Sequence, residues 1–211
     1  MFYIIAVILL FLPIKLLFPT KIIGKKNLPK RGQRCVVTSN HYSNFDGLIY
    51  EANLMHHFRF MSKKEIFKCK LFGWILKDVG LFPVDRQNFG PTDFKYTLKL
   101  LKGNKQVFIF PEGTRNKSGS EEMLKIRTGI ITFASKSDAE IVPMVMLKKP
   151  KIFSKNYVLV GEPFKVTGDV PNKLTKEEMV INLQNYTKIM ENLRKNLDEI
   201  VMAKHKKKKN A

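Results

Sequence analysis

Short apolar runs alternate with helix-like stretches along most of this chain, and this alternation limits the folds that it can adopt. Runs rich in β-branched or aromatic residues, bounded by Gly, Pro, Asn or charge, predict buried strands at residues 35–39, 58–61, 81–84, 107–110, 141–146 and 157–160. Strands that alternate with helices imply a sheet with helices packed on its faces. We therefore expect an α/β fold with a mixed, mostly parallel central sheet flanked by helices.

Capping patterns predict two helices between these strands. Ser62 with Glu65 fits a capping box that opens a helix toward Trp74. Thr92 is placed to cap a second helix, which we expect to end at Gly103.

The last quarter of the chain predicts one long helix. Thr175 and Glu178 form a second capping-box pattern. Apolar residues then recur three or four positions apart, as one stripe on a helix, at Leu183, Tyr186, Met190, Leu193, Leu197 and Ile200. We expect this stripe to pack on the core of the domain, with membrane contact as the alternative.

Residues 1–19 are almost entirely apolar and are interrupted only by Pro13 and Lys15. Their length is borderline for a bilayer span, which takes about 20 apolar residues, and they lack the features of a removable signal peptide. We expect residues 1–20 to form a membrane-anchoring helix that spans the bilayer or lies in one leaflet; a buried core helix is the alternative. The basic residues that follow favour the cell membrane, with the rest of the chain on its cytoplasmic face.

The net charge is +20, from 38 Lys and Arg against 18 Asp and Glu, which indicates an anionic partner. An apolar segment is present and no RNA- or DNA-binding motif is recognisable, so an anionic phospholipid membrane is expected as partner and nucleic acid is not. The pattern predicts one folded domain over residues 21–203. It also predicts a basic, disordered tail over residues 204–211.

The run N-H-Y-S-N-F-D, residues 40–46, directly follows the first predicted strand. Histidine is well suited to accept a proton near neutral pH, and an aspartate one turn later can accept its other ring N–H and fix the tautomer. No G-x-S-x-G nucleophile motif is found in the sequence, so His41 and Asp46 suggest direct attack by a substrate hydroxyl. The spacing alone is a weak signal, and a surface turn is the alternative.

The run F-P-E-G-T-R, residues 110–115, follows another predicted strand. Gly113 permits close approach of the backbone to a ligand, and Thr114 and Arg115 can donate to a phosphate. Glu112 can accept a hydroxyl or position an arginine. The run predicts an anion-binding loop, with an ordinary turn as the alternative.

Two weaker runs complete the set: G-L-F-P-V-D-R, residues 80–86, and I-V-P-M-V, residues 141–145. In this order the four runs resemble the blocks of the glycerolipid acyltransferase family. The resemblance covers about residues 20 to 165. It implies transfer of an acyl chain from acyl-CoA or acyl-carrier protein, as co-substrate, to the free hydroxyl of 1-acyl-sn-glycerol-3-phosphate (lysophosphatidate). The product is phosphatidic acid, and no further cofactor or metal is expected.

The resemblance also implies roles for single residues. It implies that His41 is the general base and that Asp46 orients it. Arg86 and Arg115 are expected to hold the acceptor phosphate, and Glu112 and Gly113 to shape the acceptor site. Thr114 is expected to bind substrate, and Pro143 to help frame the acyl-chain groove. One departure is Asn116, where the family usually has Ser. The alternatives are another glycerol phosphate or lysophospholipid acceptor, or a noncatalytic basic protein that binds membranes or nucleic acid.

Overall fold

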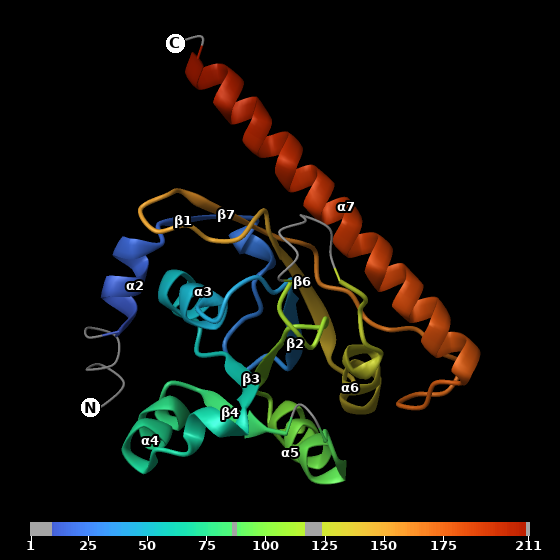
Figure 1. The fold of residues 1–211 in the computed structure, drawn as a ribbon. Coiled ribbons are helices and arrows are strands. Elements are labelled where there is room, and N and C mark those ends of the chain that lie inside the picture. The colour runs from blue at the N-terminus through green and yellow to red at the C-terminus, as the bar shows by residue number, and fades with distance from the viewer. Residues whose placement is uncertain (1–9, 86–87, 117–123, 210–211) are drawn as a thin grey trace.

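The computed structural model describes residues 10–85, 88–116 and 124–209, and its centre is a sheet of seven strands (Figure 1). The strands are β1 Thr20–Ile23, β2 Cys35–Ser39, β3 Arg59–Lys63, β4 Leu81–Val84, β5 Gln106–Ile109, β6 Glu140–Met146 and β7 Asn156–Val160. They lie in the order β1-β7-β6-β2-β5-β3-β4, and only the β6–β7 pair is antiparallel. The expected mixed, mostly parallel sheet is confirmed.

Helices cover both faces of this sheet. They are α2 Leu12–Leu17, α3 Asp46–Leu54, α4 Lys70–Asp78, α5 Pro91–Lys102, α6 Gly129–Ser137 and α7 Lys176–Lys209, with 3-10 turns at Lys25–Asn27 and Lys64–Phe67. The helices α2 and α3 pack on one face, and α5, α6 and α7 pack on the other (Figure 1).

The central strands are buried on both faces, which explains their continuous apolar runs. In β2, Cys35 and Val37 point into the core under α2 and α3, whereas Val36 points into the core under α5, α6 and α7. Phe108 of β5 belongs to the first core and its neighbour Val107 to the second. This alternation follows from the two-residue period of a strand.

Helix α7 begins with the predicted capping box. The Glu178 N–H donates to Thr175 Oγ1 at 3.1 Å, and the Thr175 N–H donates to Glu178 Oε2 at 2.6 Å. Its apolar stripe packs on the core as predicted, because Tyr186, Met190 and Leu197 are fully buried.

The helix differs from expectation at its other end, since it continues to Lys209 whereas a disordered basic tail was expected over residues 204–211. Lysine is a good helix former, and extending an existing helix costs far less than nucleating one. Residues 210–211 lie outside the described part of the chain.

The N-terminal segment is partly packed on the core. Pro13 lies in the first turn of α2, where a missing N–H costs little. Phe11 and Ile14 are buried, but Leu12 is 53% and Leu16 66% exposed. Residues 1–9 of the expected anchor lie outside the described residues. None of the helices that the structure describes is both long enough and apolar enough to cross a bilayer.

Two predicted helix starts differ from the structure. Ser62 lies in β3, paired with Pro83 of β4, so the Ser62–Glu65 capping box is wrong and α4 begins only at Lys70. Strand pairing there overrides the local capping pattern. Helix α5 begins at Pro91, with Gly90 as its N-cap in place of Thr92, and ends at Lys102, next to Gly103 as expected.

Replacing Leu197 with Ala should lower the free energy of unfolding by about 2–5 kcal/mol, because it leaves a cavity under α7. Denaturant unfolding followed by circular dichroism measures this change. Ile181→Ala on the same helix is the matched control, since Ile181 is 53% exposed. Equal effects of the two substitutions would mean that α7 does not pack on the core.

Candidate active site

The two predicted motif loops meet at one edge of the sheet. Strands β2 and β5 are parallel neighbours, with Thr38 paired to Ile109, so their carboxyl ends lie side by side. The loop that holds His41 leaves β2 at this edge, and the loop that holds Glu112 leaves β5 beside it. In parallel α/β sheets this is the edge at which ligands bind.

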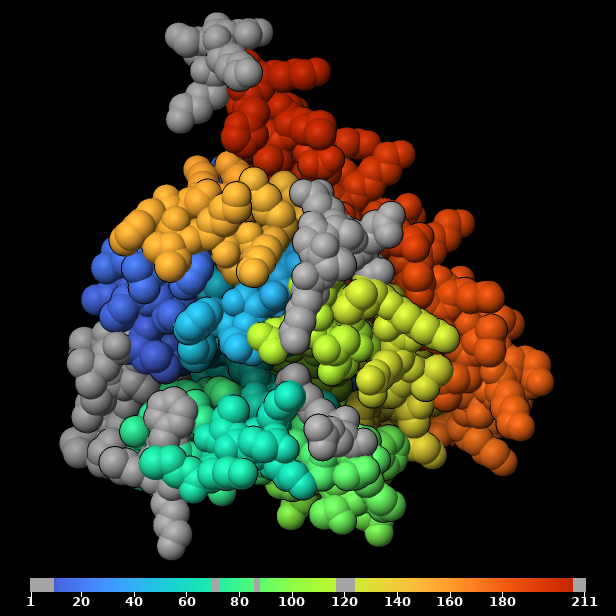
Figure 2. Space-filling model, in the orientation of Figure 1, coloured from blue at the N-terminus to red at the C-terminus, as the bar shows by residue number. Residues whose placement is uncertain are grey.

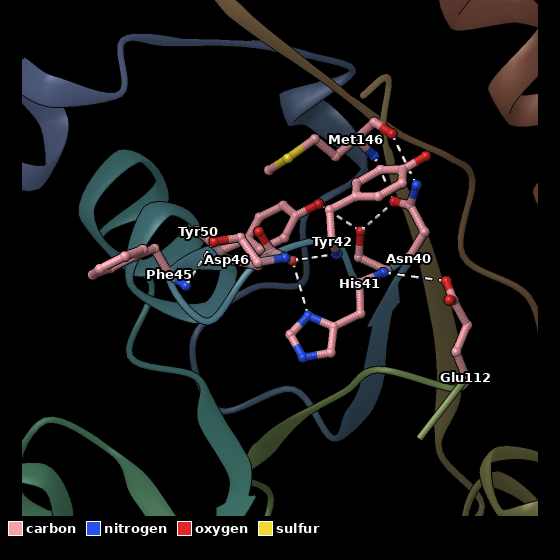
Figure 3. Close-up of polar contacts among 10 residues, drawn as sticks. Asn40, His41, Tyr42, Phe45, Asp46, Tyr50, Glu112 and Met146 are labelled. Atoms are coloured by element: carbon pink, nitrogen blue, oxygen red, sulfur yellow. Dashed lines mark hydrogen bonds and ion pairs between the residues drawn. The ribbon is translucent and has the colours of Figure 1, made fainter. Parts of the chain in front are cut away.

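His41 and Asp46 form a buried pair, as predicted (Figure 3). The distance between His41 Nδ1 and Asp46 Oδ2 is 2.8 Å, and both side chains are almost completely buried. A carboxylate at Nδ1 holds the imidazole as the tautomer with its proton on that nitrogen. Nε2 then carries a free lone pair, and it makes no hydrogen bond with any residue that the structure describes. The pair is therefore arranged to take a proton from a bound hydroxyl.

The Asp46 carboxylate also fixes the turn that carries His41. Its Oδ2 accepts the backbone N–H of Tyr42 at 2.7 Å and of Ser43 at 2.8 Å. Asp46 is the first residue of α3, where the helix dipole favours negative charge. These contacts offset part of the cost of burying the carboxylate, whose Oδ1 is buried without a hydrogen-bond partner among the described residues.

Two hydrogen bonds of the His41 backbone join its loop to the loop after β5. The His41 N–H donates to Glu112 Oε1 at 3.1 Å, and the Asn116 N–H donates to the His41 carbonyl at 2.7 Å. The Phe110 ring stacks on the His41 imidazole, with 4.0 Å between ring centroids and 13° between planes. The imidazole is thus held by a carboxylate at one nitrogen and by a ring across one face.

Glu112 supports the backbone of His41 from a buried position. Burial raises the pKa of Glu112 to about 7, and the backbone N–H groups of His41 and Leu124 act in the opposite direction. Its Oε2 is buried and has no hydrogen-bond partner among the described residues. The carboxyl group therefore carries a conformational role that the sequence did not indicate.

Gly113 is required where it lies. Its φ is +67°, and a Cβ there would come within 2.6 Å of Arg127 Nε. Arg127 thus rests against the glycine backbone and adds a cation that the sequence motifs did not predict. Thr114 is exposed and Arg115 is partly exposed on the same loop, so both can reach a ligand from solvent.

Contacts from distant parts of the chain support the His41 loop. The Asn40 side chain accepts the Met146 N–H at 2.8 Å and donates to the Met146 carbonyl at 2.9 Å, which ties the loop to the end of β6. Arg194 of α7 donates to the Tyr42 hydroxyl at 2.9 Å. Neither contact was predicted, because the partners lie more than a hundred residues apart.

An apolar pocket of about 280 Å³ opens beside the second motif loop. Its lining comprises Met61, Phe89, Ile109, Phe110, Pro111, Gly113, Arg127, Thr128, Gly129, Ile130 and Phe133. Pro143 does not line it, because it lies within β6 with its ring near Gly161 and Leu193 of α7.

The remaining predicted residue, Arg86, lies outside the residues that the structure describes. Strand β4, which precedes it, is parallel to β3 and ends at the same edge of the sheet. The described residues include no group of three or more His, Cys, Asp and Glu side chains that could hold a metal ion.

Burial of Glu112 predicts a pH-dependent stability. A carboxyl with a raised pKa binds more protons in the folded than in the unfolded state, so the free energy of unfolding falls as the pH rises from 4.5 to about 7. Glu112→Gln stays neutral and should remove part of this fall in urea unfolding between about pH 5 and pH 8. The exposed Glu178, whose pKa is lowered, is the control: Glu178→Gln should not flatten the fall. A Glu112→Gln effect that is the same at every pH would contradict the prediction.

Comparisons with known proteins agree with this geometry. The family model described as Acyltransferase matches residues 19–147. The chain is 30% identical over 186 residues to the 1-acyl-sn-glycerol-3-phosphate acyltransferase of Bacillus subtilis, covering 85% of this chain and 90% of that protein. It is 35% identical over 138 residues to the chloroplastic enzyme BAT2 of the same name from Brassica napus, covering 64% of this chain but only 39% of the plant protein.

The fold is similar to a solved structure at low sequence identity. The crystal structure of the 1-acyl-sn-glycerophosphate (LPA) acyltransferase PlsC from Thermotoga maritima matches with a TM-score of 0.64 and 20% identity, covering 86% of this chain and 71% of that one. The family match spans more than half of the sequence, and it contains His41, Asp46 and the loop of residues 110–115. The chain belongs to the acyltransferase family.

Proposed function

We propose that this chain transfers a fatty acyl chain from a thioester to the free hydroxyl of 1-acyl-sn-glycerol-3-phosphate and so forms phosphatidic acid. The observation that carries the proposal is the buried His41–Asp46 pair, tied by two hydrogen bonds to the loop of residues 110–116. The names of the relatives from Bacillus subtilis and Brassica napus support the same acceptor.

The proposed reaction is a single displacement. His41 Nε2 removes the proton of the acceptor hydroxyl as its oxygen attacks the thioester carbonyl. Asp46 stabilises the imidazolium that forms. When the tetrahedral intermediate collapses, the C–S bond breaks and the imidazolium returns the proton to the leaving thiol. Acyl-CoA or acyl-carrier protein supplies the thioester, and no covalent acyl-enzyme is needed.

Cations at the rim of the site fit a phosphate-bearing acceptor. Arg115 is partly exposed, and Arg127 lies against Gly113 of the same loop. Arg115 and Arg86 are proposed to hold the acceptor phosphate, since a guanidinium can bind phosphate through two parallel hydrogen bonds. The apolar pocket beside Phe110 and Gly113 is placed to take part of an acyl chain. The framing role expected of Pro143 stays a prediction.

The acceptor is a lipid, so we also propose that the protein works at an anionic membrane. The apolar sequence of residues 1–19 and the net charge of +20 support this. The cytoplasmic face of the cell membrane is the proposed location, on the basis of the lysines and arginines that follow residue 20.

Replacing His41 with Ala should reduce acyl transfer by about 10²–10⁴-fold, because the general base is lost. The assay is thioester consumption and product identification with a labelled acyl-CoA and a panel of acceptors. The panel contains lysophosphatidate, glycerol 3-phosphate and other lysophospholipids.

The matched control is His56→Ala, because His56 follows α3 and bonds to the Pro29 carbonyl near the opposite edge of the sheet. The acyltransferase activity of the His56→Ala variant should stay within about threefold of that of the unsubstituted protein. Retained activity in His41→Ala would refute the assignment of the base. Binding to nucleic acid without thioester consumption would favour a noncatalytic protein.

Arg115→Glu should raise the KM for lysophosphatidate by about tenfold or more, because a carboxylate then faces the acceptor phosphate. Use of monoacylglycerol, which has no phosphate, should not fall. Initial rates with both acceptors measure the difference.

Arg31→Glu is the control for the change in net charge, since Arg31 is exposed before β2, at the opposite edge. An unchanged KM for lysophosphatidate in Arg115→Glu, or an equal increase in Arg31→Glu, would mean that Arg115 does not bind the acceptor phosphate.

A further inference from the structure

The connection between β6 and β7 exposes two large apolar side chains. This segment, residues 147–155, is called the β6–β7 loop. Ile152 is 57% exposed and Phe153 is 79% exposed, the highest value among the large hydrophobic residues that the structure describes. Exposing such a pair is unfavourable in water, so it indicates a surface that meets an apolar partner.

Backbone contacts hold these side chains outward. The Phe153 N–H donates to the Leu17 carbonyl at 2.7 Å, and the Asn156 N–H donates to the Pro19 carbonyl at 2.8 Å. Phe153 has a φ of +55°, a conformation that a bulky residue adopts only when its surroundings enforce it. The loop is thus fixed against the end of α2 and is not a loose strand connection.

Helix α2 extends the apolar surface. Leu12 and Leu16 are exposed and lie one helical turn apart, so they share a side of the helix. The β6–β7 loop, in orange, and α2, in blue, lie next to each other on the face shown in Figure 2.

Positive charge surrounds these apolar groups. The β6–β7 loop has the sequence L-K-K-P-K-I-F-S-K, with exposed lysines at 148, 149, 151 and 155 and no acidic residue. Burial and the ammonium groups of Lys21, in β1, and Lys155, at the base of the loop, lower the pKa of Lys204 in α7. Like charges gathered in this way fit a surface rich in anions.

The loop leaves the sheet at the edge where the candidate active site opens. Strand β6 is parallel to β2, and its last residue, Met146, is bonded to Asn40, the neighbour of His41. A surface that binds the loop therefore lies close to the proposed base.

We propose that the β6–β7 loop and the exposed side of α2 form a docking surface for an anionic lipid layer, with Ile152 and Phe153 inserted among the lipids. The lysines would lie at the headgroups, with their aliphatic stems beside the apolar side chains. Nucleic acid would satisfy the lysines but not the aliphatic side chains of Leu12, Leu16 and Ile152. The inference rests on the proposed function only in that the acceptor is a lipid.

The test is co-sedimentation of the full chain with vesicles of phosphatidylcholine, with or without phosphatidylglycerol. Ile152→Ser with Phe153→Ser should lower partitioning into the anionic vesicles by about tenfold or more. Lys148→Gln with Lys149→Gln should lower it by about fivefold per lysine, and should not change binding to neutral vesicles.

The matched control variants remove exposed apolar or lysine side chains from other elements of the fold. Val180→Ser with Ile181→Ser deletes two side chains of similar exposure at the start of α7, distant from the loop in Figure 1. Lys95→Gln with Lys99→Gln removes two exposed lysines of α5. Both control variants should bind the anionic vesicles with an affinity within about twofold of that of the unsubstituted chain. Unchanged binding in the loop variants, or equal loss in the controls, would overturn the proposal.

Fluorescence separates insertion from adsorption. Phe153→Trp in a Trp74→Phe background carries one reporter at the loop, because Trp74 is the only tryptophan in the sequence. Brominated lipids should quench it and its emission should shift to the blue, whereas emission unchanged on vesicle binding would contradict insertion. His41→Ala should bind vesicles like the unsubstituted chain, so failure of the catalytic proposal and failure of the docking proposal give different results.

Discussion

The carboxylate of Asp46 joins the local fold to the proposed chemistry. One oxygen, Oδ2, accepts a hydrogen bond from the His41 ring and two more from the backbone of the same turn. A buried carboxylate is unfavourable unless hydrogen bonds and dipoles replace its water. Here those bonds can form only when the turn is closed and α3 begins at Asp46. The orientation of the imidazole is thus a consequence of how the turn satisfies a buried charge.

The two faces of the sheet contribute different parts of the candidate site. The imidazole and its partner ring Phe110 lie at the edge of the core under α2 and α3. The apolar pocket lies on the side of α6, between Phe110 and Phe133. Residues 110–113 border both, because Phe110, Pro111 and Gly113 line the pocket while Phe110 and Glu112 contact His41. A hydroxyl and an acyl carbonyl approaching from the two sides would meet beside this loop.

Much of the sheet could be predicted because its strands are short apolar runs bounded by Gly, Pro, Asn or charged residues. The run of residues 35–39 became β2 with identical limits, and 81–84 became β4. Helices α3 and α6 were missed because neither has a side-chain cap: their N-cap residues are Phe45 and Thr128, and neither side chain makes a capping hydrogen bond. Strand β1 was missed because its short run directly follows the apolar N-terminal segment.

The candidate site could be predicted where its residues lie within short motifs that follow predicted strands. Two of these motifs follow β2 and β5, and the parallel pairing of these strands brings them together. The stacking of Phe110 on His41, the position of Arg127 and the buried setting of Glu112 depend on three-dimensional packing. These packing contacts leave no periodic or compositional signal in the sequence.

The hydrogen bond from Arg194 shows that the folded domain extends beyond the residues that match the family model. The segment shared with the family model ends at residue 147, yet Arg194 reaches back to the hydroxyl of Tyr42, beside the proposed base. Strand β7 separates β6 from β1, and α7 covers β6 with Tyr186 and Met190. A chimera joined at residue 147 would keep every motif and still replace the helix that braces the turn of His41. Chimeras of relatives should therefore be joined outside residues 20–201, so that β1 and α7 come from the same protein.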